Sequence, residues 1–451
     1  MKEDTIVAVS TAWGEAGIAI LRLSGPDSVA LADGLFRARG KLAASAARYM
    51  RYGHILDREG AYIDEVLAVR FEAPRSYTGE EMAEIHCHGG SMSAQQAIER
   101  LLELGARLAE PGEFTRRAFL NGRIDLTQAE SVLGIIRARS DRALSSAARS
   151  LHGEVSDAVR GLRERLLLVC AGLEASFDFP EEDIPSPERK EFAPTLAQLK
   201  EDAETLHRKC RDGSVLREGI RVAIVGRPNV GKSSLLNALL QESRAIVTAI
   251  PGTTRDVIEA VLTHRGVPIR LVDTAGIRRP SDLLEEAGIA QTLSALREAD
   301  LKLWVLDGSH PFGNEDALVE EQLQGARVIV LFNKADLPQA LEPAAFMNLR
   351  PQLRVLPVSA KTALGLEHLK EEIVRAAFGE GIVEEACNAT ARQVEELRQA
   401  VRLIGEAEGA ESLDLVASCL HESRSALERF LGLSADTDLL DTIFSQFCLG
   451  K

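Results

Sequence analysis

The chain has 451 residues, of which 45% are hydrophobic and 27% are charged. This length predicts about three domains with the core of an ordinary globular protein. The net charge of −15 argues against nucleic-acid binding through overall charge, so a nucleic-acid partner would need a local basic patch. No apolar run approaches the roughly 18 residues of a membrane span, and the acidic start does not resemble a signal peptide, so we expect no membrane partner.

The cysteines are scattered and form no C-x-x-C pair; they are Cys87, Cys170, Cys210, Cys387, Cys419 and Cys448. This spacing argues against a zinc ribbon and against a disulfide framework. It fits a reducing compartment, so we expect a cytoplasmic protein.

The N-terminal residues mix strands and helices. Hydrophobic periodicity predicts three strands and one helix, at 5–10, 17–24, 63–71 and 92–104. His86, Cys87 and His88 suggest a metal site, but alternation along a strand would put Cys87 on the face opposite the two histidines. No fourth ligand is evident, so we favour packing or ligand lining over a metal.

From Asp125 the pattern becomes helical. Thr127 and Glu130 match a T-x-x-E capping box at the start of a helical stretch that runs to about residue 175. An acidic, proline-broken connection follows at 177–187, and a further helical segment extends to about 214. Residues 116–149 carry a local charge of +4, with arginines at Arg116, Arg117, Arg123, Arg137, Arg139, Arg142 and Arg149. A solvated helix face and a contact with a phosphate backbone both remain open.

The strongest signal is Gly-Arg-Pro-Asn-Val-Gly-Lys-Ser at 226–233, which fits G-x-x-x-x-G-K-[ST]. It lies between an apolar strand at 221–225 and a helix at 234–240, the context that phosphate binding requires. Lys232 offers a positive charge to the outer phosphates, where we predict a catalytic role, and the Ser233 hydroxyl can ligate magnesium. We therefore predict a nucleotide site.

Later segments indicate which nucleotide binds. Asp273, at the end of an apolar strand in Asp-Thr-Ala-Gly, can hold magnesium through water. Asp336, in Asn-Lys-Ala-Asp, can accept hydrogen bonds from the N1–H and N2–H groups of guanine, which adenine does not offer, so we predict GTP. The predicted GTP ligands are Asn229, Val230, Gly231, Lys232, Ser233, Ser234, Thr248, Thr254, Asp273, Thr274, Ala275, Gly276, Asn333, Lys334, Asp336, Ser359, Ala360 and Lys361.

The GTPase segment is predicted to be a doubly wound α/β domain, with further strands at 269–272, 301–306, 328–332 and 355–358. Helical segments on both sides suggest that it is inserted into a helical domain. Ile277 stands where Ras-like enzymes carry the glutamine that orients the attacking water. An aliphatic side chain cannot orient water, so a substitute is expected, most obviously from 278–286.

Several motifs together resemble the bacterial tRNA-modification GTPase family MnmE (TrmE), which modifies the wobble uridine of certain tRNAs. They are Gly17–Gly25, Thr78–Glu80, His88–Gly90, Pro111–Gly122, the Walker loop with Asn229, Pro251–Asp256 and the terminal Phe-Cys-Leu-Gly-Lys at 447–451. The resemblance implies an α+β N-terminal domain, a helical domain and an inserted α/β P-loop GTPase domain. Their predicted limits are 1–117 for the folate-binding and dimerising domain, 118–218 and 378–451 for the helical domain, and 219–377 for the GTPase.

The resemblance also implies ligands and roles. Magnesium would be held by Ser233 and Thr254, and potassium, in place of an arginine finger, by Asn229, Thr248, Ile250 and Thr253. Glu285 would be the catalytic substitute for the missing glutamine. A folate, 5-formyl-tetrahydrofolate or a relative, would be bound by Arg22, Glu84, Arg123 and Lys451; Arg123 is often lysine in relatives. Cys448 could be reactive or could line the pocket.

The implied partners are a second copy of the chain, the FAD-dependent subunit MnmG (GidA) in a heterotetramer, and tRNA. The alternative is a ribosome-assembly GTPase of the Era or Der type, which shares the core and the aliphatic residue at Ile277. One Walker loop rather than two, and no KH-type G-x-x-G module, argue against that alternative.

Overall fold

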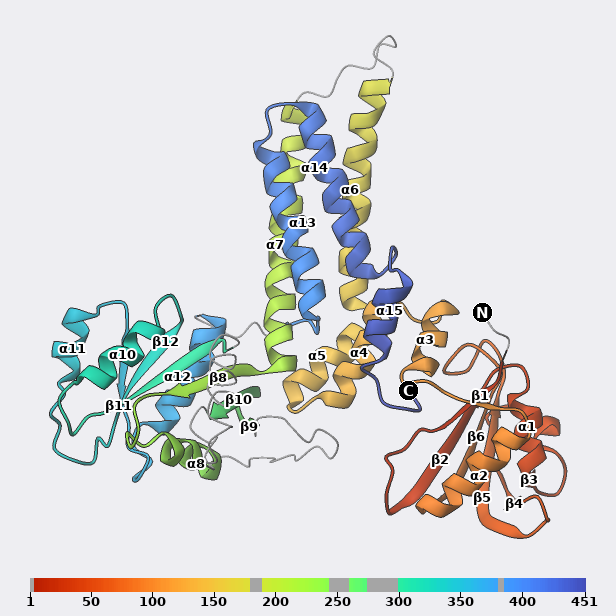
Figure 1. The fold of residues 1–451 in the computed structure, drawn as a ribbon. Helices are drawn as coiled ribbons and strands as arrows, with labels where there is room; N and C mark the ends of the chain where they lie inside the picture. The colour runs from red at the N-terminus through yellow and green to blue at the C-terminus, as the bar shows by residue number, and fades with distance from the viewer. Residues whose placement is uncertain (1–3, 179–188, 243–258, 274–298, 380–384) are drawn as a thin grey trace. The chain divides into compact units, whose positions relative to one another are not determined.

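The structure is a computed structural model that describes residues 4–178, 189–242, 259–273, 299–379 and 385–451 (Figure 1). Contacts divide the chain into two compact units, which are treated separately below. The first comprises residues 1–133, 151–187 and 410–451, and the second comprises 134–150 and 188–409. Each unit therefore combines segments that are far apart in the sequence.

The first unit contains a seven-stranded sheet with the order β3-β4-β5-β6-β2-β1-β7. Its strands are β1 (Ile6–Val9), β2 (Ala16–Ser24), β3 (Phe36–Arg37), β4 (Arg51–Leu56), β5 (Tyr62–Phe71), β6 (Met82–Gly89) and β7 (Arg107–Leu108). Neighbouring strands are antiparallel except β1 and β7, which are parallel. The strands predicted at 5–10, 17–24 and 63–71 are confirmed as β1, β2 and β5.

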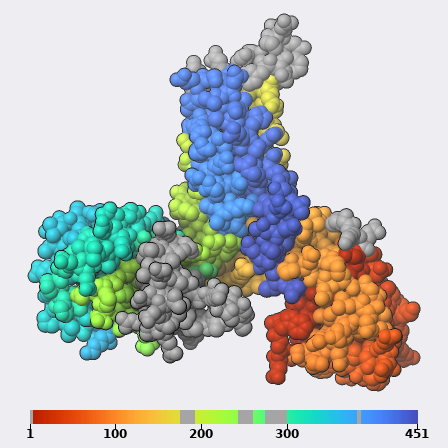
Figure 2. All heavy atoms as spheres, viewed as in Figure 1, coloured from red at the N-terminus to blue at the C-terminus, as the bar shows by residue number. Residues whose placement is uncertain are grey.

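Helices cover one face of this sheet (Figure 1): α1 (Ser28–Leu35) and α2 (Ser91–Glu103) pack on the buried side chains of alternate strand residues, including Leu21, Val66 and Ile85. The residues between them point to the other face, where Ile18, Tyr52 and Leu67 are 57%, 60% and 40% exposed. In Figure 2 the N-terminal residues, in red and orange, form one continuous packed body. The sheet thus has one buried face and one face with exposed apolar side chains.

The other helices of this unit are α3 (Glu113–Leu120), most of α4 (Leu126–Arg137), α6 (Glu154–Asp178), α14 (Leu413–Leu431) and α15 (Thr437–Phe444), with a 3-10 turn at Leu42–Ala44. Helix α14 packs along α6, and α15 packs on α3.

The predicted capping box of α4 is wrong. Asp125 and Gln128 form it instead, each side chain accepting from the other residue's backbone N–H at 2.8 and 2.9 Å. Thr127 and Glu130 are buried inside the helix, because the helix begins two residues earlier than the motif suggested.

The second unit contains a six-stranded sheet with the order β13-β12-β11-β8-β10-β9. Its strands are β8 (Ile220–Val225), β9 (Glu259–His264), β10 (Val267–Asp273), β11 (Leu301–Asp307), β12 (Val328–Asn333) and β13 (Arg354–Pro357). All neighbours are parallel except β9 and β10. The described helices that alternate with these strands are α8 (Lys232–Glu242), α10 (Asn314–Gln322), α11 (Pro343–Leu349) and α12 (Leu366–Phe378). The predicted doubly wound α/β domain is therefore confirmed.

Helices flank this sheet domain in the chain. They are α5 (Asp141–Leu151), α7 (Arg189–Glu218) and α13 (Ala391–Gly409), and α13 packs along α7. Helix α7 ends directly before β8, and the segment that follows α12 leads back into α13, as expected for an inserted domain. Among the described residues, no helix is long and apolar enough to cross a membrane.

Candidate functional site

The Walker loop connects β8 to α8 at the carboxyl edge of the parallel strands, where ligands bind in open α/β sheets. The ammonium of Lys232 donates to the carbonyl oxygens of Gly226 and Arg227 at 2.7 and 2.8 Å. These bonds fold the side chain back over the loop. Its charge is thereby held where the outer phosphates of a nucleotide would lie.

The segment Asn333–Asp336, which the sequence predicts to bind guanine, is tied directly to the Walker loop. The side-chain amide of buried Asn333 donates to the carbonyl of Val230 at 2.8 Å, and its oxygen accepts from the backbone N–H of Ala360 at 3.1 Å. Gly231 has φ of +99°, and a Cβ there would lie 2.3 Å from the Asn333 amide nitrogen, so this approach requires glycine. The side-chain amide of Asn333 thus holds the Walker loop at a fixed distance from the segments at 333–336 and 359–361.

Asp336 is oriented by the loop that follows β13. The buried hydroxyl of Ser359 donates to Asp336 Oδ1 at 2.6 Å, and this bond lowers the pKa of the carboxyl. The carboxylate is therefore ionised at neutral pH and keeps lone pairs for the two N–H groups of guanine. The structure thus brings together the predicted residues at 229–234, 333–336 and 359–361.

Asp307 is a site residue that the sequence reasoning missed. It ends β11 beside Asn333 on β12, and its Oδ2 lies 2.6 Å from the ammonium of Lys334. Burial opposes ionisation of Asp307, but Lys334 and the hydroxyl and N–H of Ser309 outweigh it and lower its pKa to about 2. The sequence did contain a signal for Asp307, because it is an acidic residue at the carboxyl end of a parallel strand, where ligands bind in open α/β sheets. This carboxylate restrains Lys334, whose backbone has a left-handed φ of +63°.

Arg227, inside the Walker loop, is a second residue that the sequence reasoning missed. Its Nε lies 3.2 Å from Oδ1 of Asp316, a buried residue in the first turn of α10, whose Oδ2 accepts from the N–H of Gly313 at 3.1 Å. The ion pair connects the loop to α10. No sequence motif pointed to Asp316.

Several predicted residues lie outside the described residues: Thr248, Ile250, Thr253, Thr254, Thr274, Ala275, Gly276, Ile277 and Glu285. Asp273 ends β10, which runs parallel to β8. Asn229, Ser233 and Ser234 are exposed at the loop and the start of α8, and Asn229 has φ of +63°. The amide of Asn229 and the hydroxyl of Ser233 are therefore accessible to cations.

A second cluster lies in the first unit and collects the four predicted folate residues around Tyr77. Arg22 on β2 is in register with Glu84 on β6, and their Nε and Oε1 atoms are 2.9 Å apart. The cationic groups of Arg22, Arg123 and Lys451 lie 5.0, 5.2 and 5.7 Å from the centre of the Tyr77 ring. Tyr77 was missed, although it directly precedes the Thr-Gly-Glu motif.

The charges in this cluster are partly desolvated. Burial opposes ionisation of Glu84, but His86 and Arg22 lower its pKa below the ordinary value. Burial and the nearby guanidinium of Arg22 lower the pKa of the Lys451 amine. A carboxylate, two guanidinium groups and an aromatic ring suit a planar heterocycle that carries hydrogen-bond donors and an anionic tail.

The polar side chains at 86–88 have partners within the N-terminal sheet. His86 pairs with Glu84 at 3.3 Å and His88 with Asp64 at 2.6 Å, while Cys87 donates inward to the carbonyl of Ala19. Among the described residues, no group of three or more His, Cys, Asp or Glu side chains could hold a metal ion.

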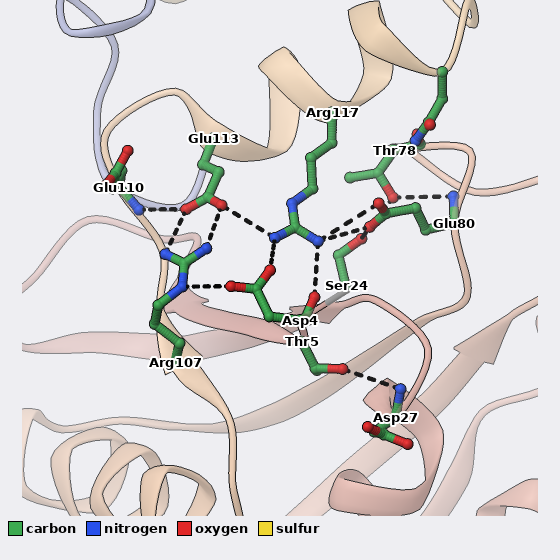
Figure 3. A network of polar contacts seen from close by, with 11 residues as sticks. Asp4, Thr5, Ser24, Asp27, Thr78, Glu80, Arg107, Glu110, Glu113 and Arg117 are labelled. Carbon is green, nitrogen blue, oxygen red and sulfur yellow. Dashed lines mark hydrogen bonds and ion pairs between the residues drawn. The ribbon is translucent and has the colours of Figure 1, made fainter. Parts of the chain in front are cut away.

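A network of ion pairs connects α3 to β7, to Asp4 and to the loop at 78–80 (Figure 3). Arg117 on α3 contacts Asp4, Glu80 and Glu113 at 2.7, 3.2 and 3.1 Å. Arg107 on β7 joins Asp4 to Glu113, at 2.8 and 2.7 Å. The side chain of Arg117 is only 9% exposed, so these carboxylates compensate a nearly buried charge. The network ties α3 to Glu80. Tyr77, three residues earlier, is also joined to α3, because its hydroxyl is hydrogen-bonded to that of Thr115 at 2.9 Å.

The arginines of 116–149 do not share one solvated face. Arg116 pairs with Asp441 at 2.8 Å, Arg117 is buried in the network, and Arg123 donates to the carbonyl of Tyr77. Arg149 donates to the carbonyl of Ala386 at 2.9 Å. These four serve intramolecular contacts, which the local charge alone could not reveal.

Comparisons with known proteins cover nearly the whole chain. The model of the family described as GTP-binding protein TrmE N-terminus matches residues 5–123, and that of the MnmE helical domain matches residues 126–448. A tRNA modification GTPase MnmE of Symbiobacterium thermophilum is 44% identical over 100% of both chains. The protein of that name from Bacillus subtilis is 43% identical over 99% of this chain and 100% of its own.

Among solved structures, the G domain of the Thermotoga maritima FeoB iron transporter covers 35% of this chain and 98% of its own, with 32% identity and a TM-score of 0.28. A score this low supports no inference, whereas the full-length matches do. The N-terminal, helical and GTPase regions are all included in them. The chain therefore belongs to the MnmE family of tRNA modification GTPases.

Proposed function

We propose that this tRNA modification GTPase hydrolyses GTP, with magnesium and potassium, in a complex that installs an aminomethyl or carboxymethylaminomethyl group on the wobble uridine of tRNA. The observation that carries the proposal is the full-length relationship to proteins named tRNA modification GTPase MnmE. The Walker loop, with Lys232 folded over it, and the ionised Asp336, whose Oδ1 accepts from Ser359, support the GTP part.

Charge stabilisation at the phosphates is assigned to Lys232 and to two cations. Ser233 and Thr254 would hold magnesium, and Asn229, Thr248, Ile250 and Thr253 would hold potassium through amide and carbonyl oxygens. A bound potassium ion would neutralise charge that develops between the β- and γ-phosphates. Glu285 would orient the attacking water, because Ile277 cannot.

The Tyr77 cluster is the proposed folate site. Glu84 would accept from the donor edge of the pterin, Tyr77 would contact its ring, and Arg123 and Lys451 would face the anionic glutamyl tail. The folate would supply the one-carbon unit of the modification. Exposed Cys448 lies three residues before Lys451, where it could line this site.

The uncovered face of the N-terminal sheet supports the proposed homodimer. Tyr52 pairs with Leu67, and Leu67 with His86, so their side chains share one face with Ile18 and Ile20. Exposed apolar side chains gathered on one face mark protein interaction sites. A second copy would bury them and would bring two GTPase domains within one assembly.

The remaining partners come from the family relationship. We assign the redox step to the FAD-dependent subunit MnmG in a heterotetramer, as the relationship to the family implies. The cytoplasm is the proposed location, in keeping with six free cysteines.

The cation assignment predicts that GTP hydrolysis is about tenfold or more faster in potassium than in sodium, since one electrostatic stabiliser is worth roughly 10²–10³ in rate. Replacing Asn229 by alanine should remove this difference. Replacing Glu285 by alanine should instead lower turnover in both salts while GTP binding is retained. Steady-state phosphate release in the two salts, with nucleotide affinity measured in parallel, checks all three outcomes.

Asn348→Ala is the matched control, because Asn348 is an exposed asparagine on α11 away from the Walker loop. Equal wild-type rates in the two salts would exclude potassium as the charge stabiliser. Normal turnover of Glu285→Ala would remove Glu285 from the mechanism.

A further inference from the structure

Cys210 and Cys387 are 177 positions apart in the sequence, on either side of the nucleotide domain, and they meet in the second unit. Cys210 is fully buried on α7, which leads into β8. Cys387 is half-buried in the segment that follows α12 and precedes α13. The two cysteines therefore mark the positions at which the chain enters and leaves the nucleotide domain.

The backbone contacts hold the returning segment against α7. The N–H of Cys387 donates to the carbonyl of Lys209 at 2.9 Å, and the Lys209 ammonium lies 2.5 Å from a Glu385 carboxylate oxygen. A Cβ at Gly213 would lie 1.7 Å from the Cys387 carbonyl oxygen, so this close approach depends on glycine. Since residues 210 and 213 share one face of the helix, Cys387 is placed beside Cys210.

The thiols of Cys210 and Cys387 are neighbours, and the Cys387 thiol donates to the carbonyl oxygen of Glu385 at 3.6 Å. The neighbouring side chain of Cys387 and burial raise the pKa of the Cys210 thiol well above its ordinary value. Cys210 is therefore a poor nucleophile toward reagents in solution, and its partial exposure makes Cys387 the accessible member of the pair.

We propose that Cys210 and Cys387 form an oxidation site, at which hydrogen peroxide converts the pair into a reversible disulfide. The Cys387 thiolate attacks a peroxide oxygen: an S–O bond forms, the O–O bond breaks, and the hydroxide that leaves is protonated to water. The Cys210 sulfur then attacks the sulfenic sulfur, so that an S–S bond forms, the S–O bond breaks and a second water carries away the thiol proton. The thiols lose two electrons in total, and the peroxide gains them.

The bond would join the two connections of the nucleotide domain covalently. In a reducing cytoplasm the pair is kept as thiols, and cytosolic disulfides are mostly transient or redox-sensing. The Cys210–Cys387 pair shares no residue with the proposed potassium and folate sites, so the oxidation proposal does not depend on either of them.

The test treats the full-length protein with hydrogen peroxide, alkylates the remaining thiols and maps the peptides. The expected result is a fall from six to four alkylated cysteines, with tryptic peptide 376–392 joined to Cys210–Arg211 and two hydrogens lighter than the sum of the two. Dithiothreitol should restore six. Cys210→Ser and Cys387→Ser should each abolish the linked peptide, and Cys170→Ser, another buried cysteine, should not.

Oxidation of Cys387 to sulfinic acid without the linked peptide would overturn the proposal. A disulfide between two chains, or a linked peptide that persists in Cys210→Ser, would overturn it as well. Serine is nearly isosteric with cysteine, and GTP binding by each variant shows that the nucleotide domain is folded.

Discussion

Replacing Asp336 by asparagine is expected to weaken GTP binding by about 100-fold or more. Two charge-assisted hydrogen bonds to guanine are each worth about 1.5–3 kcal/mol, and the substitution removes both. The Ser359 hydroxyl, which donates to Asp336 Oδ1, can bond the asparagine oxygen in the same way and leave the amide nitrogen facing the base. That nitrogen can donate to the 2-oxo group of xanthine, so affinity for XTP should rise as affinity for GTP falls.

Equilibrium titration of both nucleotides measures this exchange. Glu342→Gln is the matched control, because Glu342 is the N-cap residue of α11 and its side chain makes no capping hydrogen bond to the helix. The substitution therefore removes a carboxylate without removing a cap. Unchanged GTP affinity in Asp336→Asn would mean that the base lies elsewhere. A parallel loss of affinity for GTP and XTP would indicate damage to the fold rather than a change of base recognition.

Replacing Glu84 by glutamine is expected to weaken the binding of 5-formyl-tetrahydrofolate by roughly 30- to 100-fold. The change keeps the shape of the side chain but removes the charge that a pterin donor edge would meet, at a cost of about 2–3 kcal/mol. GTP affinity should not change, because the Tyr77 cluster and the Walker loop belong to different compact units. Isothermal titration with the folate and with GTP checks both expectations.

Glu59→Gln is the control, since Glu59 is an exposed carboxylate in the turn between β4 and β5 of the same sheet. Thermal unfolding of both variants shows whether loss of the Arg22–Glu84 ion pair lowers the stability of the fold. A loss of folate affinity without a loss of stability is then a loss of binding contacts. Wild-type folate affinity in Glu84→Gln, with the fold intact, would contradict the assignment of the Tyr77 cluster.

The sequence predicted those parts of the site that a local motif encodes. Glycines, a lysine and a serine between a strand and a helix specify a phosphate loop, and Asn-Lys-x-Asp after a buried strand specifies a guanine reader. The parallel sheet also followed from its apolar runs, because strands buried on both faces need no alternation. The four folate residues came from the family resemblance, not from local pattern.

Contacts between distant segments could not be predicted in the same way. Asp307 and Asp316 become site residues only when β11 and α10 are placed against the Walker loop and the guanine reader. Tyr77 acquires its three cationic neighbours from distant parts of the chain: Arg22 lies on β2, Arg123 follows α3, and Lys451 is near the C-terminus. The wrong capping box at Thr127 has a local cause, since Asp125 and Gln128 offered a competing box two residues earlier.

The most direct test of the account is mass spectrometry of tRNA nucleosides from the source organism without this gene. The strain should be complemented by the wild type or by Lys232→Ala, which removes the charge that the Walker loop holds over the phosphates. We expect the aminomethyl-type wobble uridines to disappear and to return only with the wild-type gene. An unchanged nucleoside profile in the deletion strain, with ribosomal precursors accumulating, would contradict a role in tRNA modification and would indicate a GTPase of ribosome assembly.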